Sequence, residues 1–247
     1  MKFSWIPYKP QIGKLLKMIL PNNMVVPILQ GRLRGKKWIV GSGNIECALG
    51  SYEYEKRILF EKVVSRHSVV YDIGAHVGFY SLLASELVGE GGRVIAFEPV
   101  PRNLNYLTKH LQINQCNNVV VIEAAVSDKS GIFHFNEGPS SSMGHLSVEG
   151  NLTVNTVSID ELVGDGKIPA PDYIKIDVEG AELLVLKGAK STLSNYSPKI
   201  FLATHSPKLH ADCCNFLASL GYKLNPIVGN DLYATTEIFA YKNRSRV

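Results

Sequence analysis

Strand-like runs of apolar residues alternate with helix-like stretches along most of this chain, and this rhythm constrains the fold more than any other feature. The runs occupy residues 69–73, 93–97, 118–123, 172–177 and 199–204. Strands that alternate with helical stretches of about 10–15 residues are typical of parallel βαβ units. Because the runs are apolar almost throughout, we expect an α/β fold whose mostly parallel sheet is covered by helices on both faces.

Two regions depart from this rhythm. The closing strand-like stretches, 222–228 and 231–241, have only a short Gly-Asn-Asp connection, which is too short for a parallel crossover. We therefore expect them to form a hairpin that contributes one antiparallel strand. Within residues 130–158, two further strands flank a Gly- and Ser-rich loop, Gly138–Gly144, whose Ser140–Ser142 stretch suits a mobile lid.

Residues 1–50 are interpreted as an N-terminal extension and residues 51–247 as the core domain. The extension contains a short helix that ends before Pro21, followed by strand-like pieces at 24–29 and 38–40. We expect the extension to pack on the core, where a cap over the substrate side is one role open to it.

Composition excludes several classes of protein. Hydrophobic residues make up 45% of the chain and charged residues 19%, which excludes disorder as the main state. We find no apolar run of 18 residues and no secretory signal, so we expect no membrane span and a cytoplasmic location. The four cysteines have neither zinc-site nor disulfide spacing, and the net charge of +4 does not predict a nucleic-acid partner. Oligomeric state is left open.

The first strand ends in a glycine turn that is preceded by an acid. Asp72 precedes Gly74 and Gly78, with Ala75 and His76 between the glycines. Glycines here would let the backbone approach a ligand closely, although a turn needed only for tight packing has the same pattern. The turn lacks the G-x-G-x-x-G spacing of dinucleotide sites, and a carboxylate would repel a pyrophosphate but attract an ammonium group. The pattern favours a cofactor that carries an amino acid over a nicotinamide dinucleotide.

The second strand also ends in an acid, Glu98, 20 residues after Gly78. An acid at this point of a doubly wound sheet is well placed to accept both hydroxyls of a ribose. The alternative is a carboxylate that caps the helix beginning near Pro101.

Charged residues interrupt the strand-like run 172–177. Lys175 and Asp177 are two residues apart and so lie on the same side of the strand, near its carboxyl end. Because lysine is almost never buried unpaired, we expect both to face a polar cleft, where their pKa values would be shifted for proton transfer. A purely structural ion pair is the alternative, and Glu179 either lines the cleft or caps the next helix.

A histidine follows the run 199–204 and is our candidate general base. His205 lies where the carboxyl end of that strand meets the presumed cleft, although a half-exposed loop histidine is the alternative. His76 and His145 are weaker candidates. Asp177, Glu179 and His205 could converge on a metal ion, but no motif with fixed spacing demands one, so we expect none.

Several segments together resemble the FkbM family of S-adenosylmethionine-dependent methyltransferases. The resemblance spans roughly Gly50 to Tyr241, and its most specific part is the K-I-D-V-E-G-A-E segment that begins at Lys175. Other matching segments are YDIGAHVGFYSLL, VIAFEPVPRNLNYLTKHLQIN and AAVSD. The family implies a class I, Rossmann-like sheet of seven strands with the seventh antiparallel, and methylation of a hydroxyl on a sugar, glycan or other small metabolite.

The resemblance also implies roles for the strand-end residues. Asp72, Gly74 and Gly78 would hold the methionine end of S-adenosylmethionine, with Ala75 and His76 beside them, and Glu98 would hold its ribose. Many related enzymes place an acid after the third strand to contact adenine, but this chain has Ala125 and Val126 there. Adenine recognition would then fall to backbone groups or to Asp128. His76 stands where the family commonly has asparagine.

These features predict direct transfer of a methyl group to a hydroxyl oxygen, with His205 as the base. Lys175 and Asp177 would position the acceptor or each other, and Asp177 would also border the cofactor. The rival interpretations are an RNA- or amine-directed methyltransferase, a nicotinamide-dependent oxidoreductase and a non-catalytic binding module.

Overall fold

A seven-stranded sheet forms the centre of the protein. In the computed structural model, residues 19–136, 145–146 and 152–243 are described. The strands across the sheet, in spatial order, are β12 (Lys223–Pro226), β13 (Glu237–Tyr241), β11 (Lys199–Ala203), β10 (Tyr173–Ile176), β3 (Val69–Ile73), β4 (Arg93–Phe97) and β5 (Val119–Ile122). β13 runs antiparallel to both of its neighbours, β12 and β11, whereas the remaining neighbouring pairs are parallel. The predicted α/β class, with seven strands and the last antiparallel, is confirmed.

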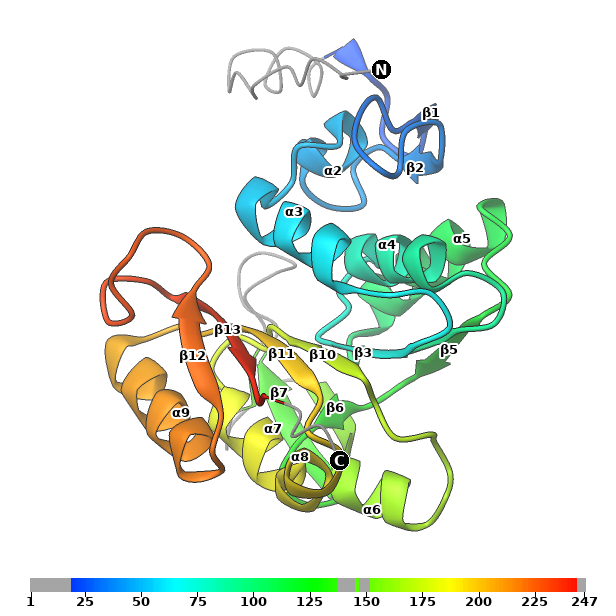
Figure 1. Cartoon of the computed structure of the whole chain (residues 1–247). Coiled ribbons are helices and arrows are strands. Elements are labelled where there is room, and N and C mark those ends of the chain that lie inside the picture. The colour runs from blue at the N-terminus through cyan, green and yellow to red at the C-terminus, as the bar shows by residue number, and fades with distance from the viewer. Residues whose placement is uncertain (1–18, 137–144, 147–151, 244–247) are drawn as a thin grey trace.

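Helices cover both faces of this sheet (Figure 1). On one face lie α3 (Tyr54–Val63), α4 (Phe79–Val88) and α5 (Pro101–Ile113). On the other face lie α6 (Ile159–Gly164), α7 (Glu182–Gly188), α8 (Lys190–Tyr196) and α9 (Pro207–Ser219). Apolar side chains of β3 and β10 are buried on both sides, which explains why these strands lack alternation. Among the described residues, no helix is both long and apolar enough to cross a bilayer.

Two boundaries differ from the sequence prediction. The helical stretch expected between the runs 172–177 and 199–204 is divided into two helices, α7 and α8, at Gly188, where a Cβ atom would lie 2.0 Å from the carbonyl oxygen of Ser127. The Gly188 carbonyl also accepts a hydrogen bond of 2.9 Å from the Ser158 hydroxyl. The closing hairpin pairs as predicted, but β13 begins only at Glu237, so its connection is longer than the Gly-Asn-Asp turn that we expected.

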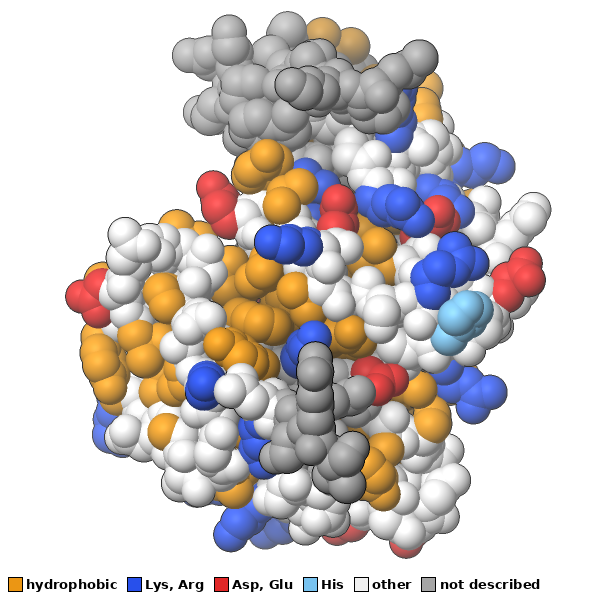
Figure 2. Space-filling view, in the orientation of Figure 1, with side chains coloured by type: hydrophobic (Ala, Val, Ile, Leu, Met, Phe, Trp, Pro, Cys, Tyr) orange, Lys and Arg blue, Asp and Glu red, His pale blue; other side chains and the backbone are white. Residues whose placement is uncertain are grey.

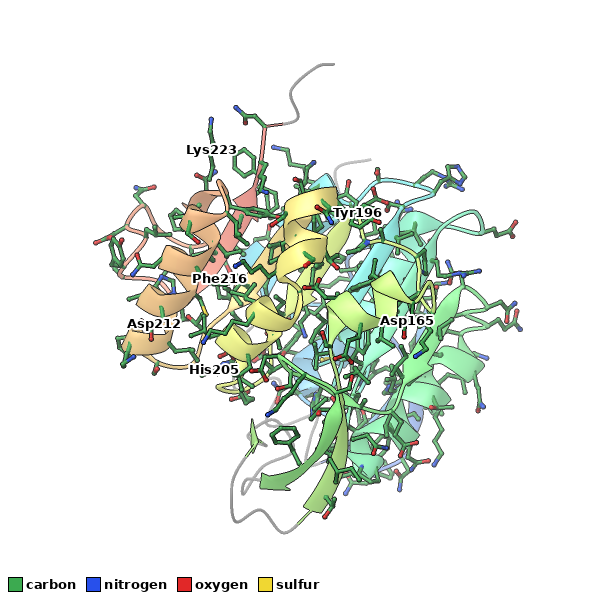
Figure 3. The ribbon with its side chains drawn as sticks, turned by 90° about the horizontal axis from the view of Figure 1, so that it is seen from below. Asp165, Tyr196, His205, Asp212, Phe216 and Lys223 are labelled. Atoms are coloured by element: carbon green, nitrogen blue, oxygen red, sulfur yellow. The ribbon has the colours of Figure 1, made fainter. Side chains whose placement is uncertain are left out.

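A smaller sheet projects from the main one. Its strands, in spatial order, are β6 (Ala125–Val126), β9 (Leu152–Val157), β7 (Gly131–Asn136) and β8 (His145–Leu146). Figure 3 shows β7 and β9 extending beyond the end of the main sheet at which His205 lies. The loop 138–144, with its predicted lid, and the side chain of His145 lie outside the described residues.

The residues before α3 fold against α5. The hairpin of β1 (Val25–Pro27) and β2 (Lys37–Ile39), followed by α2 (Ile45–Leu49), lies above α4 and α5 in Figure 1. Side chains spaced four apart along α5 and its C-cap donate to or accept from this segment: Arg102, Tyr106, His110 and the capping Asn114. Residues 1–18, which include most of the predicted helix before Pro21, lie outside the described residues.

His110 is the buried centre of this contact. Its Nε2 accepts a hydrogen bond of 3.0 Å from the Ile39 amide, and its Nδ1 lies 2.7 Å from the carbonyl oxygen of Val77. The ring therefore carries its proton on Nδ1 and donates it to Val77. Trp38 stacks on the ring with centroids 3.8 Å apart. One neutral imidazole thus ties β2 to the loop that precedes α4.

This contact should make stability depend on pH. Burial lowers the pKa of His110 to about 4, whereas an unfolded histidine titrates at about 6.5. Between these values the unfolded chain binds more protons, so stability present above pH 6.5 is lost as the pH falls towards 4, by about 3 kcal/mol. We expect a His110→Gln variant, whose side chain does not titrate, to lack this pH-dependent part of the unfolding free energy. Urea unfolding of both proteins between about pH 4 and 6.5 measures the difference in unfolding free energy. A difference that does not change with pH would contradict the prediction.

Candidate functional site

A cavity opens at the carboxyl ends of β3, β4 and β10, and most of the predicted site residues line it. The loop after β3 contributes Gly74, Ala75 and His76, and the end of β4 contributes Glu98. β6 and the end of β10 contribute four more predicted residues, Ala125, Val126, Lys175 and Asp177. Segments that are far apart in the sequence therefore converge as expected, because the carboxyl ends of parallel strands share one edge of the sheet.

The turn after β3 is fixed by close packing against β10. Gly74 has φ +75°, and a Cβ atom there would lie 1.9 Å from the carbonyl oxygen of Asp177. His76 has a left-handed φ of 51°, which is uncommon outside glycine and concentrated at functional sites. Gly78, by contrast, does not line the cavity: it caps α4 at φ 92°, and a Cβ would lie 2.5 Å from Leu107. Gly78 is therefore a packing glycine.

Glu98 is buried beneath the cavity and organises the loops around it. Its Oε2 accepts from the His76 amide at 2.8 Å, and its Oε1 accepts from the Val100 amide and the Asn103 side chain at 3.0 and 3.1 Å. Burial raises its pKa, which these hydrogen bonds partly oppose. A carboxylate offers about four acceptor positions, so roughly one remains, on Oε2. Glu98 both orders the loops, as in the capping alternative, and can accept a ligand hydroxyl.

Lys175 and Asp72 form a buried ion pair between neighbouring strands. Lys175 Nζ lies 3.3 Å from Asp72 Oδ1 and donates a 2.7 Å hydrogen bond to the Gly74 carbonyl, and the two side chains are 6% and 1% exposed. The other Asp72 oxygen accepts from Ser81 at 2.6 Å. Asp72 does not line the cavity; Lys175 lies between them. The structure thus gives Asp72 a different position from the expected direct contact with a ligand: its carboxylate holds the Lys175 ammonium in place.

Asp177 is flanked by a second buried lysine that the sequence analysis missed. Lys56 of α3, 2% exposed, lies 3.7 Å from Asp177 Oδ2, and Lys175 lies 3.9 Å from the same oxygen. Lys56 also pairs with Glu53 at 2.5 Å and Glu237 at 2.7 Å. Burial favours the neutral form of Asp177, but Lys175 and Lys56 outweigh it, and the pKa of Asp177 is lowered. Asp177 is consequently an anion at neutral pH.

His205 lies beside the cavity without lining it, surrounded by carboxylates. Its Nδ1 is 2.6 Å from Glu182, whereas its Nε2 is 3.4 Å from Glu179 and 3.5 Å from Asp177. The nearby carboxylates of Glu179 and Glu182 stabilise the charged ring and raise the pKa of His205 to about 10. The ring is therefore protonated at neutral pH, and a protonated imidazole cannot accept a proton. This charge state does not fit the expected role of general base.

The segment expected to contact adenine is apolar and holds no acid. Ala125 and Val126 are buried and line the cavity, together with Phe97. Asp128 is exposed, contacts the Ser127 hydroxyl at 3.2 Å and does not line the cavity. The geometry therefore gives no support to the expected part of Asp128 in adenine recognition, whereas the apolar side chains that line the cavity can pack against a flat base.

Comparisons with known sequences find one family profile and two curated relatives. Residues 72–224 match the sequence profile of the methyltransferase FkbM domain. Hexuronic acid methyltransferase AglP of Haloferax volcanii is 34% identical over 141 residues, 56% of this chain and 56% of that protein. Methyltransferase sdnD of Sordaria araneosa is 26% identical over 154 residues, 48% of this chain and 59% of that protein. The chain thus spans little more than half the length of these curated relatives.

Solved structures show the same fold. A methyltransferase FkbM from Methylobacillus flagellatus has a TM-score of 0.52 at 23% identity, covering 70% of this chain and 43% of that one. An S-adenosylmethionine-dependent O-methyltransferase from Thermotoga maritima has a TM-score of 0.50 at 11% identity, covering 92% and 80%. At these identities the likeness concerns the fold.

Proposed function

Because the chain belongs to the family of FkbM methyltransferase domains, we propose that it transfers a methyl group from S-adenosylmethionine to a hydroxyl of a sugar or glycan. The observation that carries this proposal is Glu98, a buried carboxylate with an acceptor position left at the edge of the cavity. The 34% identity to a hexuronic acid methyltransferase supports a sugar as the acceptor.

The residues present fit S-adenosylmethionine. Gly74 has no side chain to fill the turn, so the backbone there can approach a ligand closely. Glu98 would hold a ribose hydroxyl, and Ala125 and Val126 would pack against adenine. When bound, the cofactor supplies an electrophilic methyl group: an O–C bond replaces the O–H bond of the acceptor, a C–S bond breaks, and the proton passes to water. Lys175 and Asp177, held by their ion pairs, would orient groups at the cavity edge.

The rival functions have less support. On the face seen in Figure 2, Lys and Arg side chains are spread among acidic and uncharged ones, which favours a small acceptor over RNA. The glycine turn without dinucleotide spacing speaks against a nicotinamide cofactor. We retain the cytoplasmic location, supported by four free cysteines. We also retain residues 1–50 as an extension of the core domain, and the packing of β2 on α5 supports its contact with the core.

Methyl transfer from labelled S-adenosylmethionine tests the proposal directly. Acceptor panels should include hexuronic acids, neutral sugars, amino sugars and RNA. We expect incorporation into a sugar hydroxyl; incorporation only into RNA or an amine would contradict the acceptor class.

Replacing Glu98 with glutamine should weaken cofactor binding. Three donors point at the carboxylate, so an amide would set its NH2 group against at least one of them and lose charge-assisted bonding. We expect the Kd for S-adenosylmethionine to rise about 10- to 100-fold, equivalent to about 1.5–3 kcal/mol. Calorimetry measures it, with the exposed Glu90→Gln as the matched control. Equal affinities in the two variants would remove Glu98 from the cofactor site.

A further inference from the structure

We propose that Asp177, Glu179 and His205 bind a divalent metal ion of the kind that accepts mixed oxygen and nitrogen ligands, such as Mn²⁺. One ligand atom from each of these side chains lies within 4.8 Å of the other two. The sequence, which lacks a metal-binding motif, led us to expect no metal. The role of the ion in catalysis rests on the proposed function, but the site itself rests on the geometry that follows.

The separations between these atoms match a metal site better than direct hydrogen bonds. Nε2 of His205 lies 3.4 Å from Glu179 Oε2 and 3.5 Å from Asp177 Oδ1. An N–H···O hydrogen bond is typically about 2.7–3.2 Å long. Ligands of an ion with bonds of about 2.0–2.1 Å lie roughly 2.9 Å apart in octahedral and 3.3–3.4 Å apart in tetrahedral geometry. The ring nitrogen of His205 is thus separated from both acids by about the distance between two ligands of a four-coordinate ion.

The imidazole is held in the orientation that a metal ligand needs. Nδ1 of His205 lies 2.6 Å from Oε1 of Glu182, whose side chain is 0% exposed. The same oxygen accepts a 3.0 Å hydrogen bond from the Gly180 amide, which fixes the carboxylate. Metal-binding histidines almost always donate their other ring nitrogen to such a partner. Glu182 is therefore a positioning residue that turns Nε2 towards the two acids.

The electrostatic environment favours a cation at this point. Within the described part of the chain, the ion pairs connected to Asp177 contain six carboxylates: Asp72, Asp177, Glu179, Glu182, Glu53 and Glu237. The same network contains only two lysines, Lys56 and Lys175. With His205 protonated, as it is at neutral pH, the group has three negative charges in excess; a bound metal ion would displace the proton from Nε2, leaving four. Both lysines lie against Oδ2 of Asp177, which leaves Oδ1 facing His205.

The position of the site suits activation of an acceptor hydroxyl. Asp177 and Glu179 line the cofactor cavity, and the three side chains are 21–33% exposed, so coordination positions stay open to solvent. Figure 3 shows His205 at the end of the sheet from which β7 and β9 project. An ion here would hold the hydroxyl oxygen and lower its pKa, so that its proton leaves to water. His205 would then act as a ligand rather than as a base.

Titration with Mn²⁺, followed by electron paramagnetic resonance, tests the site on the full chain after removal of metals with a chelator. We expect one Mn²⁺ per chain to lose its free-ion signal. Glu179→Gln and His205→Ala, both at partly exposed positions, should weaken binding more than tenfold, and Glu182→Gln about 10- to 100-fold. Asp165→Asn, which removes an exposed carboxylate from the pair with Lys167, is the matched control and should bind normally.

Absence of Mn²⁺ binding, or equal binding by Glu179→Gln and the control, would overturn the site. Cofactor affinity of the chelated protein, measured by calorimetry, separates this result from a failure of the proposed function. Methyl transfer that survives complete chelation would overturn the ion's role while the proposed function stands. Site-specific Mn²⁺ binding without methyl transfer to any acceptor would overturn the proposed function while the metal site stands.

Discussion

Replacing Lys175 with methionine should destabilise the protein by about 3–5 kcal/mol, because it removes one partner of a buried ion pair and leaves the other charged. The carboxylate left behind is that of Asp72, which is 1% exposed and whose Oδ1 has the Lys175 ammonium 3.3 Å away. Ser81 still donates to Oδ2, but a hydroxyl does not replace a cation. Urea unfolding at neutral pH measures the loss.

Two further variants separate this cause from lost packing. Lys187→Met changes an exposed lysine of α7 and should leave the unfolding free energy nearly unchanged. The double variant Lys175→Met with Asp72→Asn removes both charges, and we expect it to recover most of the loss, since an uncharged pair carries no unpaired buried charge. A double variant as unstable as Lys175→Met alone would show that the ammonium's other contacts, above all with the Gly74 carbonyl, account for the effect.

The same pair shows how far strand patterns predict a site. Lys175 stood out because a lysine in an apolar run needs a partner, and the two-residue spacing put Asp177 on the same side. The partner that lies closest is instead Asp72, because β3 and β10 are neighbours with Lys175 opposite Asp72 in register. Sequence alone gives the side of a strand, but the neighbouring strand and its register come from the assembled sheet.

Helix α3 shows where periodicity fails. Ile58, Leu59 and Val63 have the spacing of one helix face, and residues 54–63 do form a helix. Ile58 is nevertheless 42% exposed, whereas Lys56 and Arg57 are buried. Lys56 is held inwards by Glu53 at the start of the same helix and by Asp177 and Glu237 from other parts of the chain. Arg57 pairs with Glu61 one turn away. Prediction from hydrophobic periodicity assigns charged residues to the solvent-exposed face. For a helix that buries ion pairs, as α3 does, it therefore predicts the wrong buried face.

The charge of His205 could not be predicted from the sequence for a related reason. The end of β11 places His205 beside the cleft as expected, but its charge depends on Glu179 and Glu182, which belong to the turn and helix after β10. Glu179 adopts a left-handed φ of 56°, an uncommon conformation for a residue other than glycine. Local spacing does not reveal this backbone turn, which brings the carboxylate within 3.4 Å of the ring.

Gly74→Ala should destabilise the fold and abolish cofactor binding together. The residue has φ +75°, where an L side chain is strained, and its Cβ would lie 1.9 Å from the Asp177 carbonyl oxygen. That atom belongs to the backbone, so relief requires the β3 turn and the end of β10 to separate. We expect a loss of about 2–5 kcal/mol in unfolding free energy from strain and overpacking combined. Thermal unfolding and calorimetry with S-adenosylmethionine measure the two effects.

Gly164→Ala is the matched control, since nothing lies within 4 Å of its added Cβ and its φ is not positive. It should leave both stability and cofactor affinity nearly unchanged. If Gly74→Ala is as stable as this control, the close approach of β3 to β10 is not required. If instead it is unstable yet binds the cofactor normally, Gly74 serves packing alone, as Gly78 does. A loss of both stability and cofactor affinity is the result expected if the space beside Gly74 is needed by the neighbouring strand and by the ligand.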